Sequence, residues 1–130
     1  MKILIVDNNV STVTTLSALL ADEGPFEIEV AYGGQECLDK LNVSPDYDLV
    51  LLDIMMPGVS GMKVCEEMVK DSKLRNIPVL LMSSAMPIPP DEFHDSLEKY
   101  GDLVVVKGAI EKPFIMKELL AKIHQISKKI

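Results

Sequence analysis

Apolar and polar residues follow two different rhythms along this chain. Nearly continuous apolar runs, typical of strands buried on both faces, occupy Lys2–Val6, Tyr47–Asp53 and Ile77–Ser84. A further run, Leu103–Val106, is expected to open another strand. Phe26–Val30 instead alternates between apolar and acidic residues, which predicts a strand with one exposed face.

Between these strands, apolar residues recur at the spacing of one helix face. Five helices are predicted, over Ser11 to about Glu23, part of Gly33–Leu41, Met62 to about Asp71, Asp91–Tyr100, and Met116 to about Lys129. The inward face of the first helix is expected to carry Val13, Leu16, Leu19 and Leu20. Gly24 and Pro25 end that helix, because glycine and proline commonly follow a helix C-terminus.

Strands and helices alternate throughout, which predicts an α/β fold whose parallel sheet is covered by helices on both faces. The exposed face of the second strand favours a place at the sheet edge. Together these features predict a flavodoxin-like, doubly wound sheet of five strands in the order 2-1-3-4-5, with five helices. Ligands of such sheets bind outside the carboxyl ends of the strands, where strands one and three adjoin.

Length and composition suit one domain. The chain has 130 residues, 48% of them apolar, so residues 1–130 are expected to form a single domain with its own core. The sequence contains no membrane-spanning run and no signal peptide, which favours a cytoplasmic protein. A net charge of −7 argues against nucleic-acid binding. Cys37 and Cys65 lie in apolar helical segments and are expected to be buried, reduced thiols.

Chemically useful side chains stand at the predicted carboxyl ends of the strands. The first strand ends in Asp7 and Asn8, the third in Asp53 and the fourth in Ser84, and "EKPF" (Glu111–Phe114) follows the fifth. Two acids, a hydroxyl and a lysine should therefore meet at one edge of the sheet. Hard oxygen ligands at a partly open site suit Mg²⁺, and a carboxylate can accept a phosphoryl group.

Four stretches of the sequence resemble the receiver domain of two-component response regulators, over essentially the whole chain. They are "ILIVDN", "DLVLLDIMMPGVSGM", "PVLLMSSA" and "EKPF". The resemblance, which is to single-domain receivers of the chemotaxis type, implies that Asp53 is the phosphoacceptor and that Ser84 and Lys112 are the catalytic and switch residues. It also implies that Mg²⁺ is held by Asp7, Asn8, Asp53 and the backbone carbonyl of Met55.

The same resemblance implies a signalling function. A histidine kinase or phosphotransfer protein would donate the phosphoryl group, and the domain would catalyse only its own phosphoryl transfer and hydrolysis. The face made by the fourth helix, the fifth strand and the fifth helix would contact a downstream protein target. The domain would be a monomer or a weak dimer. The sequence leaves open whether the chain is part of a longer protein.

The first strand departs from the usual receiver pattern at Asn8, where the family usually has a second acid that ligates the metal. A pair of unit charges about 4 Å apart is worth about 4 kcal/mol gross in a partly solvated site. For a divalent ion, much of the energy lost with the second acid is offset, because Asn8 costs less to desolvate than an acid and its amide oxygen can still contact the metal. We expect a net loss of about 1–2 kcal/mol, or roughly tenfold in Mg²⁺ affinity.

The fifth strand departs from the pattern as well. The interval before Lys112 is longer than usual, and Lys107 fits the usual spacing from Ser84, whereas the following proline favours Lys112. The extra residues are expected to lengthen the strand or to bulge it. Many receivers carry an aromatic switch residue three positions before the lysine, and Ala109 (or Val104, if Lys107 is the lysine) stands there instead.

Two other functions therefore stay open beside the phosphoacceptor. A degenerate receiver would bind partners without phosphorylation, which Asn8 and the missing aromatic favour. A phosphatase would need a second acid two residues after Asp53, and Met55 stands there. Asp7 itself has an ordinary alternative role as the cap of the first helix.

Overall fold

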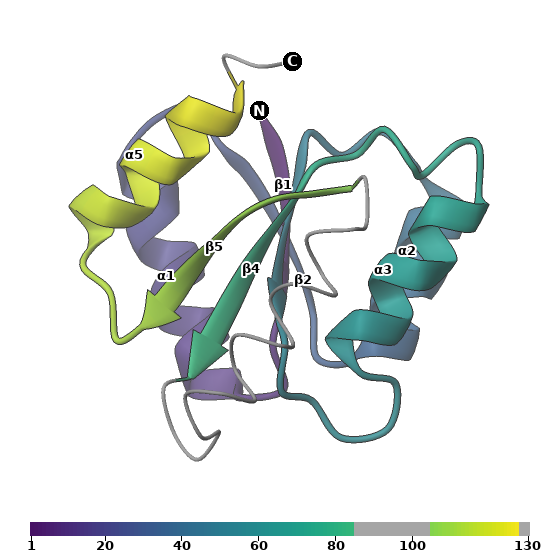
Figure 1. Ribbon diagram of the computed structural model, residues 1–130. Coiled ribbons are helices and arrows are strands. Elements are labelled where there is room, and N and C mark those ends of the chain that lie inside the picture. The colour runs from purple at the N-terminus through teal and green to yellow at the C-terminus, as the bar shows by residue number, and fades with distance from the viewer. Residues whose placement is uncertain (85–104, 128–130) are drawn as a thin grey trace.

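The computed structural model describes residues 1–84 and 105–127, and it contains one five-stranded parallel sheet (Figure 1). The strands are β1 (Lys2–Val6), β2 (Glu27–Ala31), β3 (Leu49–Asp53), β4 (Val79–Ser84) and β5 (Val106–Lys112). They lie in the order β2-β1-β3-β4-β5, and every neighbouring pair is parallel. The predicted strand order is confirmed.

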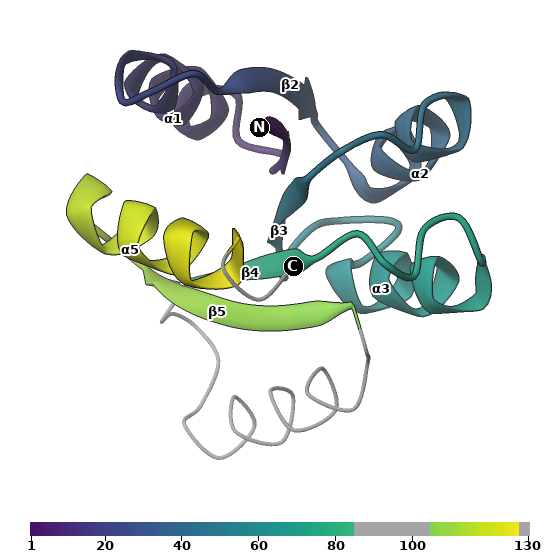
Figure 2. The ribbon, with the colours of Figure 1, turned by 90° about the horizontal axis from the view of Figure 1, so that it is seen from above.

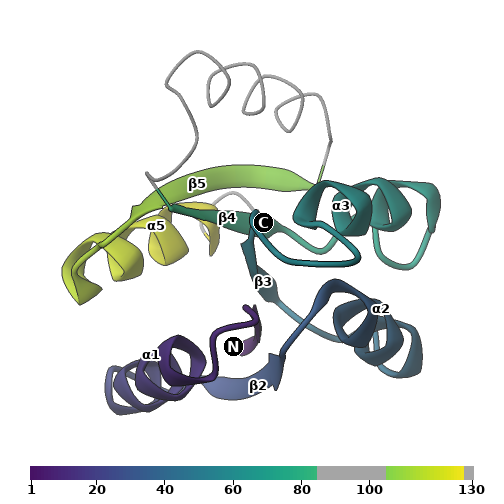
Figure 3. The same cartoon turned by 90° about the horizontal axis from the view of Figure 1, so that it is seen from below.

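Helices cover both faces of the sheet. The described helices are α1 (Val10–Asp22), α2 (Gly34–Val43), α3 (Gly61–Lys70) and α5 (Met116–Ser127). Figures 2 and 3 show α1 and α5 on one face and α2 and α3 on the other. The helix predicted at Asp91–Tyr100 lies outside the described residues. The arrangement is the flavodoxin-like, doubly wound fold that the alternating pattern predicts.

The alternation of side chains along the strands divides the core into two halves. The α1–α5 core takes from the strands Ile3, Ile5, Leu49, Leu51, Leu80, Met82 and Ile110. The α2–α3 core takes from them Leu4, Val6, Val50, Leu52, Val79 and Leu81. Strands β1 and β3 are buried on both sides, which explains why their sequences are continuously apolar.

The edge position of β2 is confirmed, and its side chains are exposed or half-buried until Ala31. The start of β5 differs from the prediction. The strand begins at Val106, the preceding Val105 is a buried turn residue, and residues 103 and 104 lie outside the described part. The expected extra length is present, since β5 has seven residues, and a bulge accompanies it at Lys107.

Two smaller predictions about the core have different outcomes. Leu19 is 47% exposed, so its predicted inward position is wrong, because the buried stripe of α1 is only wide enough for Val13, Leu16 and Leu20. Both cysteines are free and buried, as predicted. Burial raises the pKa of Cys37 and of Cys65 to about 12, which keeps both thiols protonated and unreactive.

Among the helices of residues 1–84 and 105–127, we find none with the length and apolar character needed to cross a membrane.

Neighbouring leucines of α1 provide a test of this packing. Leu20 is fully buried, so Leu20→Ala should lower the free energy of unfolding by about 2–5 kcal/mol. Leu19→Ala removes the same atoms from an exposed site and should change it by about 0.5 kcal/mol or less. Urea denaturation of both variants measures the difference. Equal losses would show that α1 is rotated about its axis, with Leu19 as deeply buried as Leu20.

Candidate functional site

The carboxylates of β1 and β3 lie on the same face of the sheet. Asp7 follows Ile5 by two residues and therefore shares the side of the α1–α5 core. Asp53, the last residue of β3, stands opposite Met82, which also belongs to that core. Asp7 lies just after β1, and its backbone is still bonded to the neighbouring strand, because its amide donates a hydrogen bond to the carbonyl of Ala31 in β2.

The bulge in β5 brings a lysine to the same face. Val106 pairs with Val79, whereas Gly108 pairs with Leu80, so Lys107 is an extra residue in β5. One extra residue exchanges the two faces for every side chain that follows it. Val106 accordingly packs against the α2–α3 core, although Ile110, four residues later, packs in the α1–α5 core. Lys112, two residues beyond Ile110, thus points to the side of the two acids.

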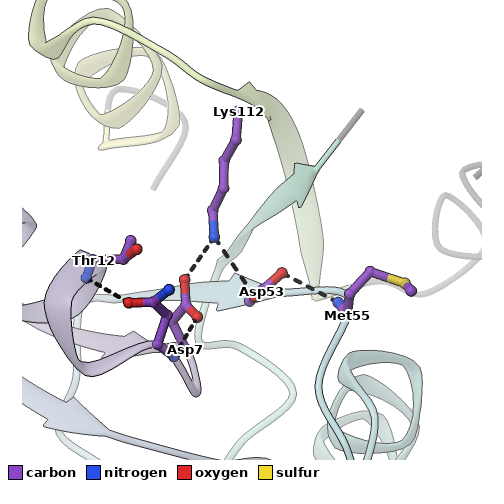
Figure 4. Close-up of polar contacts among 6 residues, drawn as sticks. Asp7, Thr12, Asp53, Met55 and Lys112 are labelled. Atoms are coloured by element: carbon purple, nitrogen blue, oxygen red, sulfur yellow. Dashed lines mark hydrogen bonds and ion pairs between the residues drawn. The ribbon is translucent and has the colours of Figure 1, made fainter. Parts of the chain in front are cut away.

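Lys112 bridges the two carboxylates (Figure 4). Its Nζ atom lies 2.6 Å from Asp7 Oδ2 and 3.6 Å from Asp53 Oδ2. Asp7 is 1% exposed and Asp53 is 5% exposed, so neither charge is well hydrated. Buried charges are costly unless they are paired, and the shared ammonium provides the pairing. This contact explains how an acid can end so apolar a strand as β3.

Backbone amides hold the other oxygen of each carboxylate. Asp7 Oδ1 accepts a hydrogen bond from the Asn9 amide at 3.0 Å, and Asp53 Oδ1 accepts one from the Met55 amide at 3.2 Å. Each carboxylate is therefore fixed in orientation, with Oδ2 turned toward Lys112 (Figure 4).

Asn9, which the sequence reasoning missed, serves two purposes. Its backbone amide donates the hydrogen bond to Asp7. Its side chain caps α1 by accepting a hydrogen bond from the Thr12 amide at 3.0 Å. The alternative role of Asp7 as the helix cap is therefore wrong. The signal was available in the sequence, because asparagine immediately before an apolar helical pattern is a typical N-cap.

The environment of Asp53 disfavours its ionised form. Burial raises the pKa of its carboxyl above the ordinary value, and the negative charge of Asp7 raises it further. The Lys112 ammonium and the Met55 amide act in the opposite direction without cancelling the effect of burial. Asp53 is thus a carboxylate whose charge is stabilised mainly by one cation.

The remaining predicted site residues surround this cluster. Asn8 is exposed beside Asp7, and Met55 is 46% exposed after Asp53. Ser84 ends β4, and its backbone stands opposite Lys112 in the register. Lys107 is exposed and lines a separate hollow of about 230 Å³ with residues of α5. The structure therefore brings Lys112, and not Lys107, to the two acids.

The donor set at this edge fits a magnesium ion. Within residues 1–84 and 105–127, no group of three or more His, Cys, Asp or Glu side chains could hold a metal. Two carboxylates, the amide of Asn8 and the carbonyl of Met55 are hard oxygen donors, and magnesium commonly takes only one or two carboxylates and keeps several waters. Among the residues that the structure describes at this edge, none is a cysteine or histidine that would favour a softer metal.

The sequence profile of the family described as "Response regulator receiver domain" matches residues 3–124. The chain belongs to this family. Receiver domains are signalling domains of two-component systems. They generally bind Mg²⁺ at the phosphorylation site, and they interact with a kinase or phosphotransfer partner.

Curated relatives of this receiver domain are longer than the chain. "Transcriptional regulatory protein CpxR homolog" of Haemophilus influenzae is 36% identical over 125 residues, which cover 96% of this chain and 49% of that protein. "Response regulator ArlR" of Staphylococcus aureus is 30% identical over 126 residues, which cover 96% of this chain and 52% of that protein. The chain thus spans about half the length of the curated relatives it matches.

Solved structures support the same fold for this receiver domain. The chemotaxis protein CheY4 of Vibrio cholerae superposes with a TM-score of 0.78 at 26% identity, covering 96% of this chain and 97% of that one. The N-terminal domain of a response regulator receiver protein from Methanoculleus marisnigri JR1 superposes with a TM-score of 0.70 at 35% identity, covering 95% and 94% of the two chains.

The raised pKa of Asp53 predicts a pH-dependent change in stability. A carboxyl that is harder to ionise in the folded state lowers stability at pH values above its folded pKa, and this penalty fades as the pH falls toward the ordinary value of 3.8. Asp53→Asn removes the charge and should therefore be more stable than the parent protein at neutral pH without divalent ions.

Urea denaturation at several pH values, in the presence of a chelator, measures this effect. The stability advantage of Asp53→Asn should shrink as the pH is lowered through the raised pKa. Asp39→Asn, which changes an exposed acid on α2, is the control and should show no comparable advantage. If Asp53→Asn is no more stable than the parent protein at neutral pH, burial does not penalise the ionised form of Asp53.

Proposed function

We propose that this receiver domain accepts a phosphoryl group on Asp53 from the phosphohistidine of a kinase or phosphotransfer protein, in the presence of Mg²⁺. The observation that carries the proposal is the arrangement of the Asp53 carboxylate. Its Oδ1 atom is held by the Met55 amide, and its Oδ2 atom faces the Lys112 ammonium at 3.6 Å. A carboxylate fixed in this way presents its Oδ2 atom beside a cation.

In the proposed reaction, Asp53 Oδ2 attacks the phosphorus atom of the phosphohistidine. A phosphorus–oxygen bond forms, the phosphorus–nitrogen bond breaks, and its electron pair remains on the imidazole nitrogen. Lys112 neutralises part of the negative charge on the equatorial phosphoryl oxygens. Hydrolysis of the resulting acyl phosphate by water restores the carboxylate and limits the lifetime of the signal.

The oxygen atoms of Asp7, Asn8, Asp53 and the Met55 backbone are the groups that would hold Mg²⁺. When bound, the ion supplies additional positive charge that neutralises the phosphoryl oxygens. Asn8 brings an amide where a second acid is usual, so we expect the affinity for Mg²⁺ to be roughly tenfold weaker than with an acid there. At the end of the first strand, Asp7 would then supply the negative charge for binding Mg²⁺, and its carboxylate is already paired with Lys112.

Phosphorylation would change the balance of charges around Lys112. The phosphoryl group carries about −1.5 to −2 charges at neutral pH, more than the carboxylate of Asp7. Lys112 would be drawn from Asp7 toward Asp53, and Ser84, opposite Lys112 in the register, would approach the phosphoryl group. This shift would bias β5, α5 and the helix predicted over Asp91–Tyr100 between two packings and so alter the face that contacts a downstream protein.

A phosphorylation-independent interaction module is the second candidate. Two observations favour it: the neutral Asn8 beside Asp7, and the small, partly buried Ala109 where an aromatic switch residue is usual. In this alternative the cluster of Asp7, Asp53 and Lys112 would serve only to hold the strand ends together. The two candidates differ in whether Asp53 becomes covalently modified.

Intact-mass measurement separates the two candidates. The protein incubated with Mg²⁺ and a small phosphodonor such as acetyl phosphate should gain the mass of one phosphoryl group, and the gain should require Mg²⁺. Asp53→Ala should abolish it because the accepting oxygen is gone, whereas Asp39→Ala, at an exposed acid, should retain it. If the parent protein gains no mass under these conditions, or if Asp53→Ala gains as much, the phosphoacceptor function is wrong.

A further inference from the structure

Helix α2 begins with a glycine that has no room for a side chain. A Cβ atom added at Gly34 would overlap the carbonyl oxygen of Val59 and would lie 2.8 Å from the Val59 Cγ1 atom. The carbonyl oxygen belongs to the backbone, so it cannot rotate away as the end of a flexible side chain can. Any other residue at this position must displace either the start of α2 or the loop that contains Val59.

That loop, residues 54–60, connects Asp53 to α3. At its start, the Met55 amide donates the hydrogen bond that orients the Asp53 carboxylate, as Figure 4 shows. At its end, the Ser60 hydroxyl caps α3 by accepting a hydrogen bond from an amide of the first turn. Hydrogen bonds therefore hold both ends of the loop. We expect a displacement of Val59 to be taken up within residues 54–60, which include Met55.

The tip of the loop is exposed, whereas Ile54 and Met56 before it are buried in the α2–α3 core. Pro57 and Gly58 are exposed, and Gly58 adopts a φ of +75°, where the chain turns sharply. Val59 is the first residue after this turn that packs against the α2–α3 core. The turn is therefore held on both sides, by the buried Met56 before it and by the contact of Val59 with the start of α2 after it.

We infer that Gly34 is a positioning residue for the phosphoacceptor site. Its missing side chain lets both the carbonyl and the side chain of Val59 lie against the start of α2, and these contacts help to place Met55 and, through the Met55 amide, the carboxylate of Asp53. The inference rests on the proposed function of Asp53, and it assigns to α2 a role in organising a site to which it contributes no ligand.

The adjacent glycine offers a matched control. A Cβ atom at Gly33 would have no atom within 4 Å, and its φ of −171° is extended backbone that any residue adopts. Gly33→Ala and Gly34→Ala thus add the same methyl group one residue apart, in open space and against Val59 respectively. A second control, Leu41→Ala, removes a fully buried side chain of α2 and destabilises the domain without adding bulk near the loop.

The test compares these variants at a temperature where all of them are folded. Calorimetric titration measures the affinity for Mg²⁺, and amide NMR spectra report the surroundings of Met55 and Asp53. Gly34→Ala should weaken Mg²⁺ binding roughly tenfold, as loss of an orienting partner typically does, and should shift both amide signals. Gly33→Ala and Leu41→Ala should keep the parent affinity and the parent signals at these two residues.

The NMR readout keeps this inference separate from the proposed function. If the parent protein accepts no phosphoryl group but Gly34→Ala shifts the Met55 and Asp53 signals, the positioning role stands and the proposed function fails. If Gly34→Ala lowers the melting temperature but leaves both signals and the Mg²⁺ affinity as in Leu41→Ala, Gly34 is merely structural and the inference is overturned.

Val59→Ala covers the case in which Gly34→Ala does not fold. It removes the Cγ atoms of the loop from their contact with Gly34 without adding any bulk. Hydrogen exchange of the Met55 amide should become faster and Mg²⁺ binding should become weaker, in the same direction as for Gly34→Ala. Unchanged exchange and unchanged affinity in Val59→Ala would overturn the inference independently.

Discussion

The site depends on one lysine that neutralises two buried carboxylates. Asp7 and Asp53 lie at the ends of adjacent strands, where their negative charges repel each other and little water reaches them. Lys112 contacts both, and it can do so only because β5 presents it on the face of the α1–α5 core. The single extra residue at Lys107 produces that orientation, since an unbulged strand would direct the Lys112 side chain to the opposite face.

The parts of the structure that follow from local pattern could be predicted from the sequence. Alternation of strands and helices predicts the doubly wound sheet, and the general position of ligand sites predicts that Asp7 and Asp53 meet. A longer or bulged fifth strand was expected, but the position of the bulge could not be predicted, because it is set by contacts with the neighbouring strand. Spacing alone therefore left Lys107 and Lys112 unresolved. The prediction that Leu19 faces inward was wrong for a related reason, because helical spacing does not reveal how wide a stripe of the helix the sheet buries.

The resting site is held from several directions by groups that do no chemistry. An amide from the turn before α1 fixes Asp7, and an amide from the loop after β3 fixes Asp53. The start of α2, at Gly34, limits where that second loop can lie. A sequence motif identifies the candidate site residues themselves. The contact at Gly34 cannot be identified in this way, because it depends on the close approach of segments that are distant in the chain. Asn8 is different, because its expected effect on the affinity for Mg²⁺ comes from its own side-chain amide and can be predicted from the sequence.

A crystal structure of the domain with Mg²⁺ and beryllium fluoride, a mimic of the phosphoryl group, tests the central claim most directly. We predict beryllium fluoride bound to an oxygen of Asp53, with the ammonium of Lys112 in contact with a fluoride and Mg²⁺ beside Asp7. Beryllium fluoride at another residue, or Lys112 turned away while Lys107 makes the contact, would contradict the account.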